Sequence, residues 1–149
     1  MKKLIYLALG ALALSTVMPA WQAEQKSTAR TLKVKLNYTG SGTVDEKHKI
    51  FVFMFDTPDF ATTPEVNPIG MESGTAKDAM LTFADTGKSP VYIVAVFDPT
   101  GGYEGQSYPP SGSSLGIYGA TPGKPDPIKI EAGQKVEVEL KFDDSTKMQ

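Results

Sequence analysis

The chain has 149 residues, with 17 acidic and 15 basic side chains, a formal net charge of −2, one histidine and no cysteine. The lack of cysteine excludes disulfide bonds, thiolate catalysis and cysteine-ligated metal centres. The nearly balanced charge excludes the strongly basic surface that is typical of nucleic-acid-binding domains.

The first 23 residues have the pattern of a secretory signal peptide. Two lysines precede an apolar run at residues 4–14, and the next nine residues include three polar side chains and a proline and end in Ala23. The apolar run is shorter than the roughly 20 residues that a membrane-spanning helix needs. We therefore expect a cleaved leader helix at 1–23, a polar tether at 24–30, and a mature protein in the periplasm or outside the cell.

The following segments alternate between short apolar runs and turns, which predicts six or seven β-strands. Residues 31–38 alternate apolar and polar side chains, which is typical of a strand with one buried face. Residues 50–55 and 91–97 are apolar on both faces, which indicates strands that are covered on both sides. Residues 59–74 predict a loop or a short edge segment, because they contain two prolines and two glycines.

Alternation also predicts strands at 79–84, 128–131 and 135–142. The first of these is expected to end in a hairpin-like turn at 85–88, although its beginning also has helix-forming residues. The last two are expected to pair as a hairpin, because their apolar residues are in phase.

This order of elements predicts an all-β fold, namely an antiparallel β-sandwich of about six to eight strands, immunoglobulin-like or prealbumin-like. The domain is expected to cover residues 31–143 and to be followed by a C-terminal tail at 144–149. If the strands at 50–55, 79–84 and 91–97 form a meander, the first and the third run in the same direction.

Two segments resemble a known group of domains. Residues 81–98 contain a strand, a turn marked by Gly87 and Pro90, and the strand Tyr92-Ile93-Val94-Ala95-Val96-Phe97-Asp98. This arrangement is similar to an element of the carboxypeptidase-regulatory-like, or prealbumin-like, β-sandwiches. Residues 128–138, with Ala132-Gly133 at the turn, resemble the terminal hairpin of the same group. The resemblance implies an accessory or binding module and supplies no catalytic residues.

Two aspartates end the two fully apolar runs in the same way, as Phe55-Asp56 and Phe97-Asp98. In a meander both would lie at the same end of the sandwich, close to Glu104 in the following loop. Carboxylate oxygens on loops suit Ca²⁺, which takes six to eight oxygen ligands. Asp56, Asp98 and Glu104 are therefore a candidate calcium site. The alternative is that each aspartate caps a turn by accepting backbone N–H groups.

Residues 98–127 are the most unusual stretch, because seven of these thirty residues are glycine and six are proline. Ordered loops of this length are uncommon and are frequently functional. The stretch contains Tyr103, Tyr108 and Tyr118, whose rings are candidates for stacking on a sugar or on a protein partner. The alternative is that these rings pack the loop onto its own sandwich.

The sequence thus predicts a secreted, non-catalytic binding or accessory module that contacts a protein or carbohydrate partner of the cell envelope through residues 98–127. The alternative is a structural or assembly protein that pairs through an exposed edge strand. An enzyme is not expected. The G-x-S-x-G match at 112–116 lacks a helix pattern after the serine, and the only histidine, His48, precedes it. Apart from calcium, no cofactor is expected, and neither are a nucleic-acid partner or a membrane span after leader removal.

Overall fold

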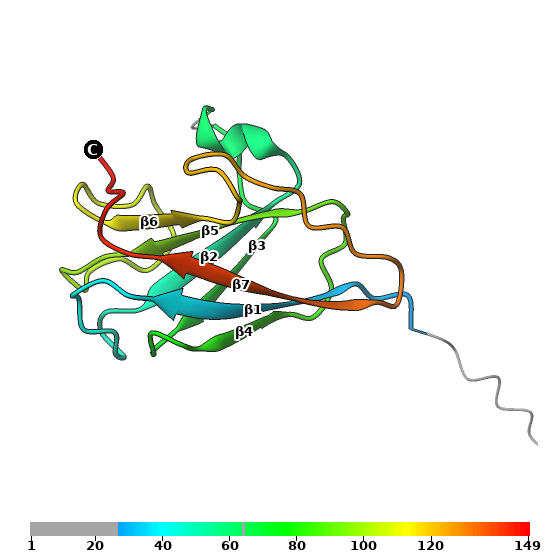
Figure 1. The fold of residues 1–149 in the computed structure, drawn as a ribbon, viewed down its shortest axis with the longest axis horizontal. Coiled ribbons are helices and arrows are strands. Elements are labelled where there is room, and N and C mark those ends of the chain that lie inside the picture. Colours follow the sequence, from blue (N-terminus) through cyan, green and yellow to red (C-terminus); the bar gives the residue numbers. More distant parts are fainter. Residues whose placement is uncertain (1–26, 64) are drawn as a thin grey trace, which may run out of the picture.

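The computed structural model describes residues 27–63 and 65–149, so the predicted leader at 1–23 lies outside the described residues. Within them the chain forms two β-sheets that pack face to face (Figure 1), which confirms the predicted all-β sandwich. None of the helical structure in this part of the chain has the length and apolar character needed to cross a membrane. The elements in chain order are β1 (Thr31–Tyr38), β2 (Ile50–Phe55), a 3-10 helix (Pro58–Ala61), β3 (Gly70–Gly74), β4 (Met80–Phe83), β5 (Tyr92–Phe97), β6 (Ser114–Ile117) and β7 (Lys135–Phe142).

The first sheet has three strands in the order β4-β1-β7. The alternation predicted for β1 is confirmed, since Leu32, Val34 and Leu36 are fully buried between the sheets. The strand β1 is antiparallel to β4 and parallel to β7 over eight residue pairs. The other strand pairs are antiparallel, as predicted, and the parallel pairing of the first and last strands is the exception.

The predicted hairpin between 128–131 and 135–142 is wrong. Ile128 pairs instead with Val91, just before β5, through two backbone hydrogen bonds of 2.8 and 3.0 Å. Ile128 and Ile130 are both buried in the main core. The apolar alternation of residues 128–131 therefore indicates burial between the sheets and not pairing with β7. The neighbour of β7 is β1.

The second sheet has four strands in the order β3-β2-β5-β6, and all its pairs are antiparallel. The strand β2 is buried on both faces, as predicted. Ile50, Val52 and Met54 point into the main core, and the three phenylalanines of β2 point to the outer face of the sheet. The edge segment predicted within 59–74 is the strand β3.

The predicted meander is also wrong. The strand β4 belongs to the first sheet, so β2 and β5 are direct antiparallel neighbours, with Ile50 opposite Phe97 and Phe55 opposite Tyr92. The physical reason is exposure. Met80 and Thr82 of β4 are exposed, which suits the outer face of the three-stranded sheet, whereas β2 and β5 are apolar on both faces and need cover on both. The turn at 85–88 consequently links two sheets instead of closing a hairpin.

The stretch at 98–127 is not one continuous loop, because β6 lies within it and pairs with β5. The glycine-rich part before β6 contributes Tyr103 to the outer face of the four-stranded sheet. The predicted tail also has a defined position, since backbone hydrogen bonds join residues 146 and 148 to residues 112–115, beside β6 (Figure 1). In the described part of the tether, the Arg30 Nε atom donates to the Ile130 carbonyl oxygen at 3.1 Å.

Candidate functional site

The outer face of the four-stranded sheet carries a second apolar cluster, separate from the main core. Phe51, Phe53 and Phe55 of β2 form its base together with Val96 and Tyr103, and all five side chains are buried. Phe60, Val66, Val94 and Leu115 pack against them while remaining partly exposed. A sandwich needs one core between its sheets, so this additional aromatic layer has to be explained by what covers it.

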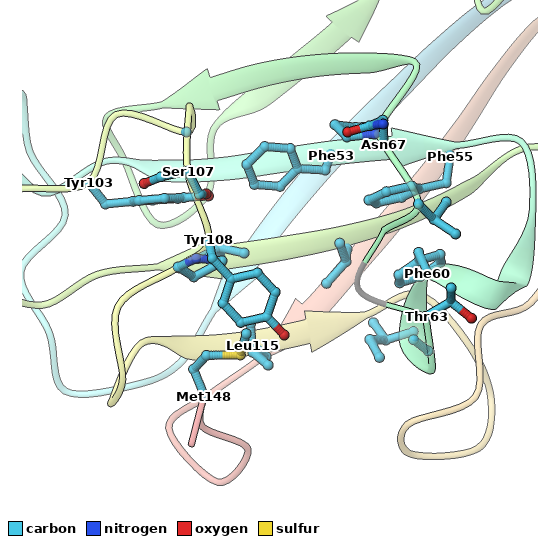
Figure 2. Close-up of a pocket in the computed structure, with 18 of the residues that line it drawn as sticks. Phe53, Phe55, Phe60, Thr63, Asn67, Tyr103, Ser107, Tyr108, Leu115 and Met148 are labelled. Atoms are coloured by element: carbon cyan, nitrogen blue, oxygen red, sulfur yellow. The ribbon is translucent and has the colours of Figure 1, made fainter.

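Two chain segments border this face and leave a hollow of about 570 Å³ between them (Figure 2). We call this hollow the aromatic groove. Residues 60–63 and 66–68 border one side, residues 103 and 105–109 border the other, and the sheet forms the floor. The rings of Phe55 and Phe60 stack with their centroids 4.4 Å apart, so the 3-10 helix is packed onto β2. The groove therefore has a β-sheet floor and one wall that is held by aromatic stacking.

Tyr108 is the most exposed ring at the groove, with 67% of its surface accessible. Figure 2 shows it over the hollow, close to Leu115 and Met148. The adjoining border is polar, since it includes Thr63, Asn67 and Ser107. The site thus combines an apolar floor with hydroxyl and amide groups at its margin.

Tyr103 has the opposite role, because only 7% of it is exposed. Its ring meets Phe51 edge to face at a centroid distance of 5.2 Å, and its hydroxyl donates to the Ser107 carbonyl oxygen at 3.0 Å. Burial raises the pKa of Tyr103 to about 12. Tyr103 therefore holds the loop onto the sheet. Tyr118 packs against the main core, so the structure brings two of the three predicted tyrosines to the groove and places the third elsewhere.

Asp98 caps a turn, as the alternative interpretation predicted. Its carboxylate accepts hydrogen bonds from the backbone N–H of Thr100 (2.8 Å), Gly102 (3.1 Å) and Tyr103 (3.2 Å), and from the Thr100 hydroxyl (2.7 Å). Burial raises the pKa of Asp98, but these hydrogen bonds outweigh burial and hold the pKa below its usual value. The carboxylate thus shapes the beginning of the loop that carries Tyr103.

The expectation that Asp56 and Asp98 lie at one end of the sandwich is wrong. Asp56 follows Phe55, which pairs with Tyr92, whereas Asp98 lies at the other end of β5. At about 3.3 Å per residue, the two carboxylates are separated by the strand length, roughly 20 Å. In the part of the chain that the structure describes, no three acidic or histidine side chains gather as a metal site. The candidate calcium site of Asp56, Asp98 and Glu104 is therefore not assembled.

Asp144 is a structural centre that the sequence interpretation missed, because it was assigned to a tail. Its carboxylate accepts hydrogen bonds from the Tyr38 hydroxyl (2.6 Å), the Ser114 hydroxyl (2.7 Å), and the Ser41 backbone N–H (2.8 Å) and hydroxyl (3.0 Å). These bonds, with that of Tyr38 foremost, hold the pKa of Asp144 far below its usual value. Burial and the contact with Asp144 raise the pKa of Tyr38 to about 12. Asp144 thus joins the ends of β1, β6 and β7.

Ser114, the central serine of the G-x-S-x-G match, is the first residue of β6 and is 1% exposed. Its hydroxyl is used in the bond to Asp144, and a strand rather than a helix follows it. The geometry of a nucleophile elbow, which needs a helix after the serine, is not present at this position. His48 lies far along the chain and contacts Asp45, with its Nδ1 atom 2.8 Å from the Asp45 Oδ1 atom.

Comparison with known proteins found no matching family model, no matching curated protein and no matching solved structure. The resemblance to the prealbumin-like sandwiches therefore stays a prediction. The chemistry of the site has to be argued from its own geometry.

Proposed function

We propose that this chain is a secreted, non-catalytic binding module that holds its ligand in the aromatic groove. The observation that carries the proposal is the hollow of about 570 Å³ beneath the exposed ring of Tyr108. Ligand sites in proteins commonly have volumes of about 300–1,000 Å³, an apolar lining and a few polar groups at the border. The aromatic groove has all three properties.

The lining favours a ligand with a flat apolar face and a polar edge. Tyr108 offers exposed ring surface above a floor lined by the buried rings of Phe53 and Phe55. Asn67 and Ser107 offer hydrogen-bonding groups at the margin. A pyranose sugar has this chemistry, because its C–H groups form an apolar face and its hydroxyl groups lie at the rim. We therefore assign a carbohydrate of the cell envelope or the surrounding medium as the ligand class, which agrees with the predicted leader.

The position of Tyr108 supports this assignment. Tyr108 is followed by Pro109 and Pro110, and a residue before proline is restricted to extended backbone conformations. Each of the two proline rings also fixes the backbone angle φ of its own residue. The segment that carries the ring therefore loses little conformational freedom when a ligand binds, which favours affinity.

The proposal is tested by titrating the ¹⁵N-labelled protein (residues 24–149) with soluble oligosaccharides and, in a parallel series, with short peptides that contain aromatic residues. We expect a saccharide to shift the amide resonances of the groove residues. Tyr108→Ala should weaken this binding by about tenfold or more, as expected for a central aromatic contact. Met80→Ala is the matched control, because Met80 is an exposed apolar residue on the other sheet.

Three results would contradict the proposal. If neither series shifts groove resonances, the groove is not a ligand site for this chemistry. If Tyr108→Ala leaves the affinity unchanged, the exposed ring is not part of the site. If the aromatic peptides bind and no saccharide does, the ligand class is protein and not carbohydrate.

A further inference from the structure

The outer edge of β6 is covered in part by the chain's own residues 146–148, which we call the strap. The Leu115 N–H donates to the Thr146 carbonyl oxygen, and the Met148 N–H donates to the Ser113 carbonyl oxygen, both at 2.9 Å. The Gly112 N–H in turn donates to the Met148 carbonyl oxygen at 2.9 Å. The strap therefore pairs with β6 as a short antiparallel strand.

The strap leaves the rest of this edge open. Alternate residues of an antiparallel strand direct their peptide groups to opposite sides. The Tyr118 N–H donates to the Ile93 carbonyl oxygen at 3.1 Å, so the peptide group of Tyr118 points toward β5. Because the direction alternates along the strand, the peptide groups of Leu115 and Ile117 point away from β5. The Leu115 N–H meets the strap, whereas the Ile117 peptide group lies on the side of a second hollow of about 340 Å³. This hollow is bordered by β6, Thr39 and residues 119–120, 122–123, 141–143 and 145–146.

The position of Asp144 explains why the strap stops short. In the register that pairs Ser114 with Lys147, Asp144 would lie opposite Ile117. The Asp144 carboxylate is instead held by Tyr38 and Ser41 at the end of the other sheet, and it contacts β6 only through the Ser114 hydroxyl. The chain consequently pairs with the backbone of β6 only from Thr146 onward. A separate strand has no such anchor and can continue along the edge.

We propose that the outer edge of β6 is a strand-accepting site, at which an extended peptide of a partner protein pairs antiparallel with residues 113–117 and displaces the strap. The resident segment shows which peptide fits. Met148 borders the aromatic groove beside Leu115 and Tyr108 (Figure 2), so the partner carries an unbranched apolar side chain at the corresponding position. The partner strand adds backbone hydrogen bonds to Ile117 that the strap does not make.

The strap has the properties of an element that can be displaced. Thr146 and Lys147 are exposed, and Met148 is only partly buried. Segments with few buried apolar contacts open at a lower free energy than the core does. The strap therefore protects an edge that would otherwise be free for pairing, and it yields to a strand that makes more contacts.

A second copy of this chain is the weaker candidate for the partner. The strap of a second copy would make the same hydrogen bonds as the resident strap. It could not reach Ile117 either, because its own Asp144 is anchored by Tyr38 and Ser41. A segment tethered in the same molecule acts at an effective concentration in the millimolar range, so an identical segment in another molecule competes poorly. A peptide that also reaches Ile117 does not have this disadvantage.

The test uses the full chain and a synthetic peptide of residues 144–149 in which Asp144→Ala removes the anchoring carboxylate. Met148→Pro in the protein removes the N–H that bonds Ser113 and so weakens the strap. Gln149→Pro is the matched control, because it places the same residue just beyond the strap. We expect the peptide to shift the amide resonances of residues 113–117 in Met148→Pro and to slow hydrogen exchange at Ile117. Wild type and Gln149→Pro should bind about tenfold more weakly, because their strap competes for the edge.

A second variant, deletion of residues 146–149, opens the edge even if Met148→Pro does not. If millimolar peptide leaves the exchange of Ile117 unchanged in both variants, the proposal is overturned. If the deletion variant dimerises in sedimentation experiments and does not bind peptide, the edge belongs to a second copy and the proposal is equally overturned. Leu115 and Ile117 border both sites, so the peptide titration is done without saccharide and the saccharide titration without peptide, and each can fail while the other succeeds.

Discussion

Replacing Asp144 by asparagine tests whether this carboxylate joins the two sheets at their common end. Two hydroxyl donors, from Tyr38 and Ser114, meet its Oδ1 atom at 2.6 and 2.7 Å. Two donors from Ser41 meet its Oδ2 atom at 2.8 and 3.0 Å. Asparagine keeps the size of the side chain and one acceptor oxygen, but it loses the negative charge. Its NH₂ group is a donor that faces one of the two pairs of donors, so the two hydrogen bonds of that pair are lost.

The expected loss of stability follows from these bonds. A hydrogen bond to a charged group contributes about 1.5–3 kcal/mol net, and the substitution removes two of the four. Asp144 is partly exposed, so solvent screening reduces this value. We expect Asp144→Asn to lower the free energy of unfolding at pH 7 by about 2–4 kcal/mol. Urea unfolding followed by circular dichroism measures the loss.

Asp143→Asn is the matched control. Asp143 is the exposed neighbour of Asp144, and its carboxylate accepts a local bond from the Ser145 N–H at 2.8 Å. Substitutions at such surface positions usually change stability by less than about 0.5 kcal/mol. A comparable loss in both variants would mean that negative charge at the end of β7 matters rather than the bonds of Asp144.

The pH dependence supplies an independent check. The folded-state pKa of Asp144 lies below the value of about 3.9 of an unfolded chain. Its stabilisation is therefore fully present above about pH 4 and is lost as the pH falls toward the folded-state pKa. The difference between wild type and Asp144→Asn should shrink below pH 4. A constant difference from pH 7 to pH 2, or a loss under about 0.5 kcal/mol at pH 7, would refute the reasoning.

Three further predictions concern the groove, the core and alkaline pH. Tyr103→Ala should lower the free energy of unfolding by about 3–5 kcal/mol, whereas Tyr108→Ala should change it by less than about 0.5 kcal/mol; equal urea midpoints would contradict the roles assigned to the two rings. Gly116→Ala should lower it by about 1–3 kcal/mol, because the new Cβ would overlap the last phenylalanine of β7, while Gly102→Ala meets open space and serves as control. The free energy of unfolding should fall between pH 10 and pH 12, because unfolded tyrosines ionise near pH 10 while the pKa values of Tyr38 and Tyr103 in the folded protein are about 12. Ultraviolet titration of phenolate formation measures these pKa values. Ionisation of all tyrosines near pH 10 in the folded protein would contradict the prediction.

Some features of the fold could be read from the chain because they depend on local periodicity. The side chains of a strand alternate with period two, so the buried faces of β1 and β7 follow directly from their residue patterns. The double burial of β2 likewise follows from a run without polar residues. The capping role of Asp98 was one of two alternatives, because an aspartate after a strand can bond the backbone just ahead of it.

Strand pairing and the assembly of the groove required the tertiary structure. An apolar pattern states which face of a strand is buried but does not name its neighbour, since many partners satisfy the same alternation. The meander, the terminal hairpin and the shared end of Asp56 and Asp98 were wrong for this reason. The groove depends on segments that are far apart in the chain, from Phe53 to Met148. Asp144 gave no local signal because its partners Tyr38 and Ser114 are 106 and 30 residues away. Local pattern thus determined which residues form strands and which faces they bury, and long-range packing decided which strands meet and where a ligand site opens.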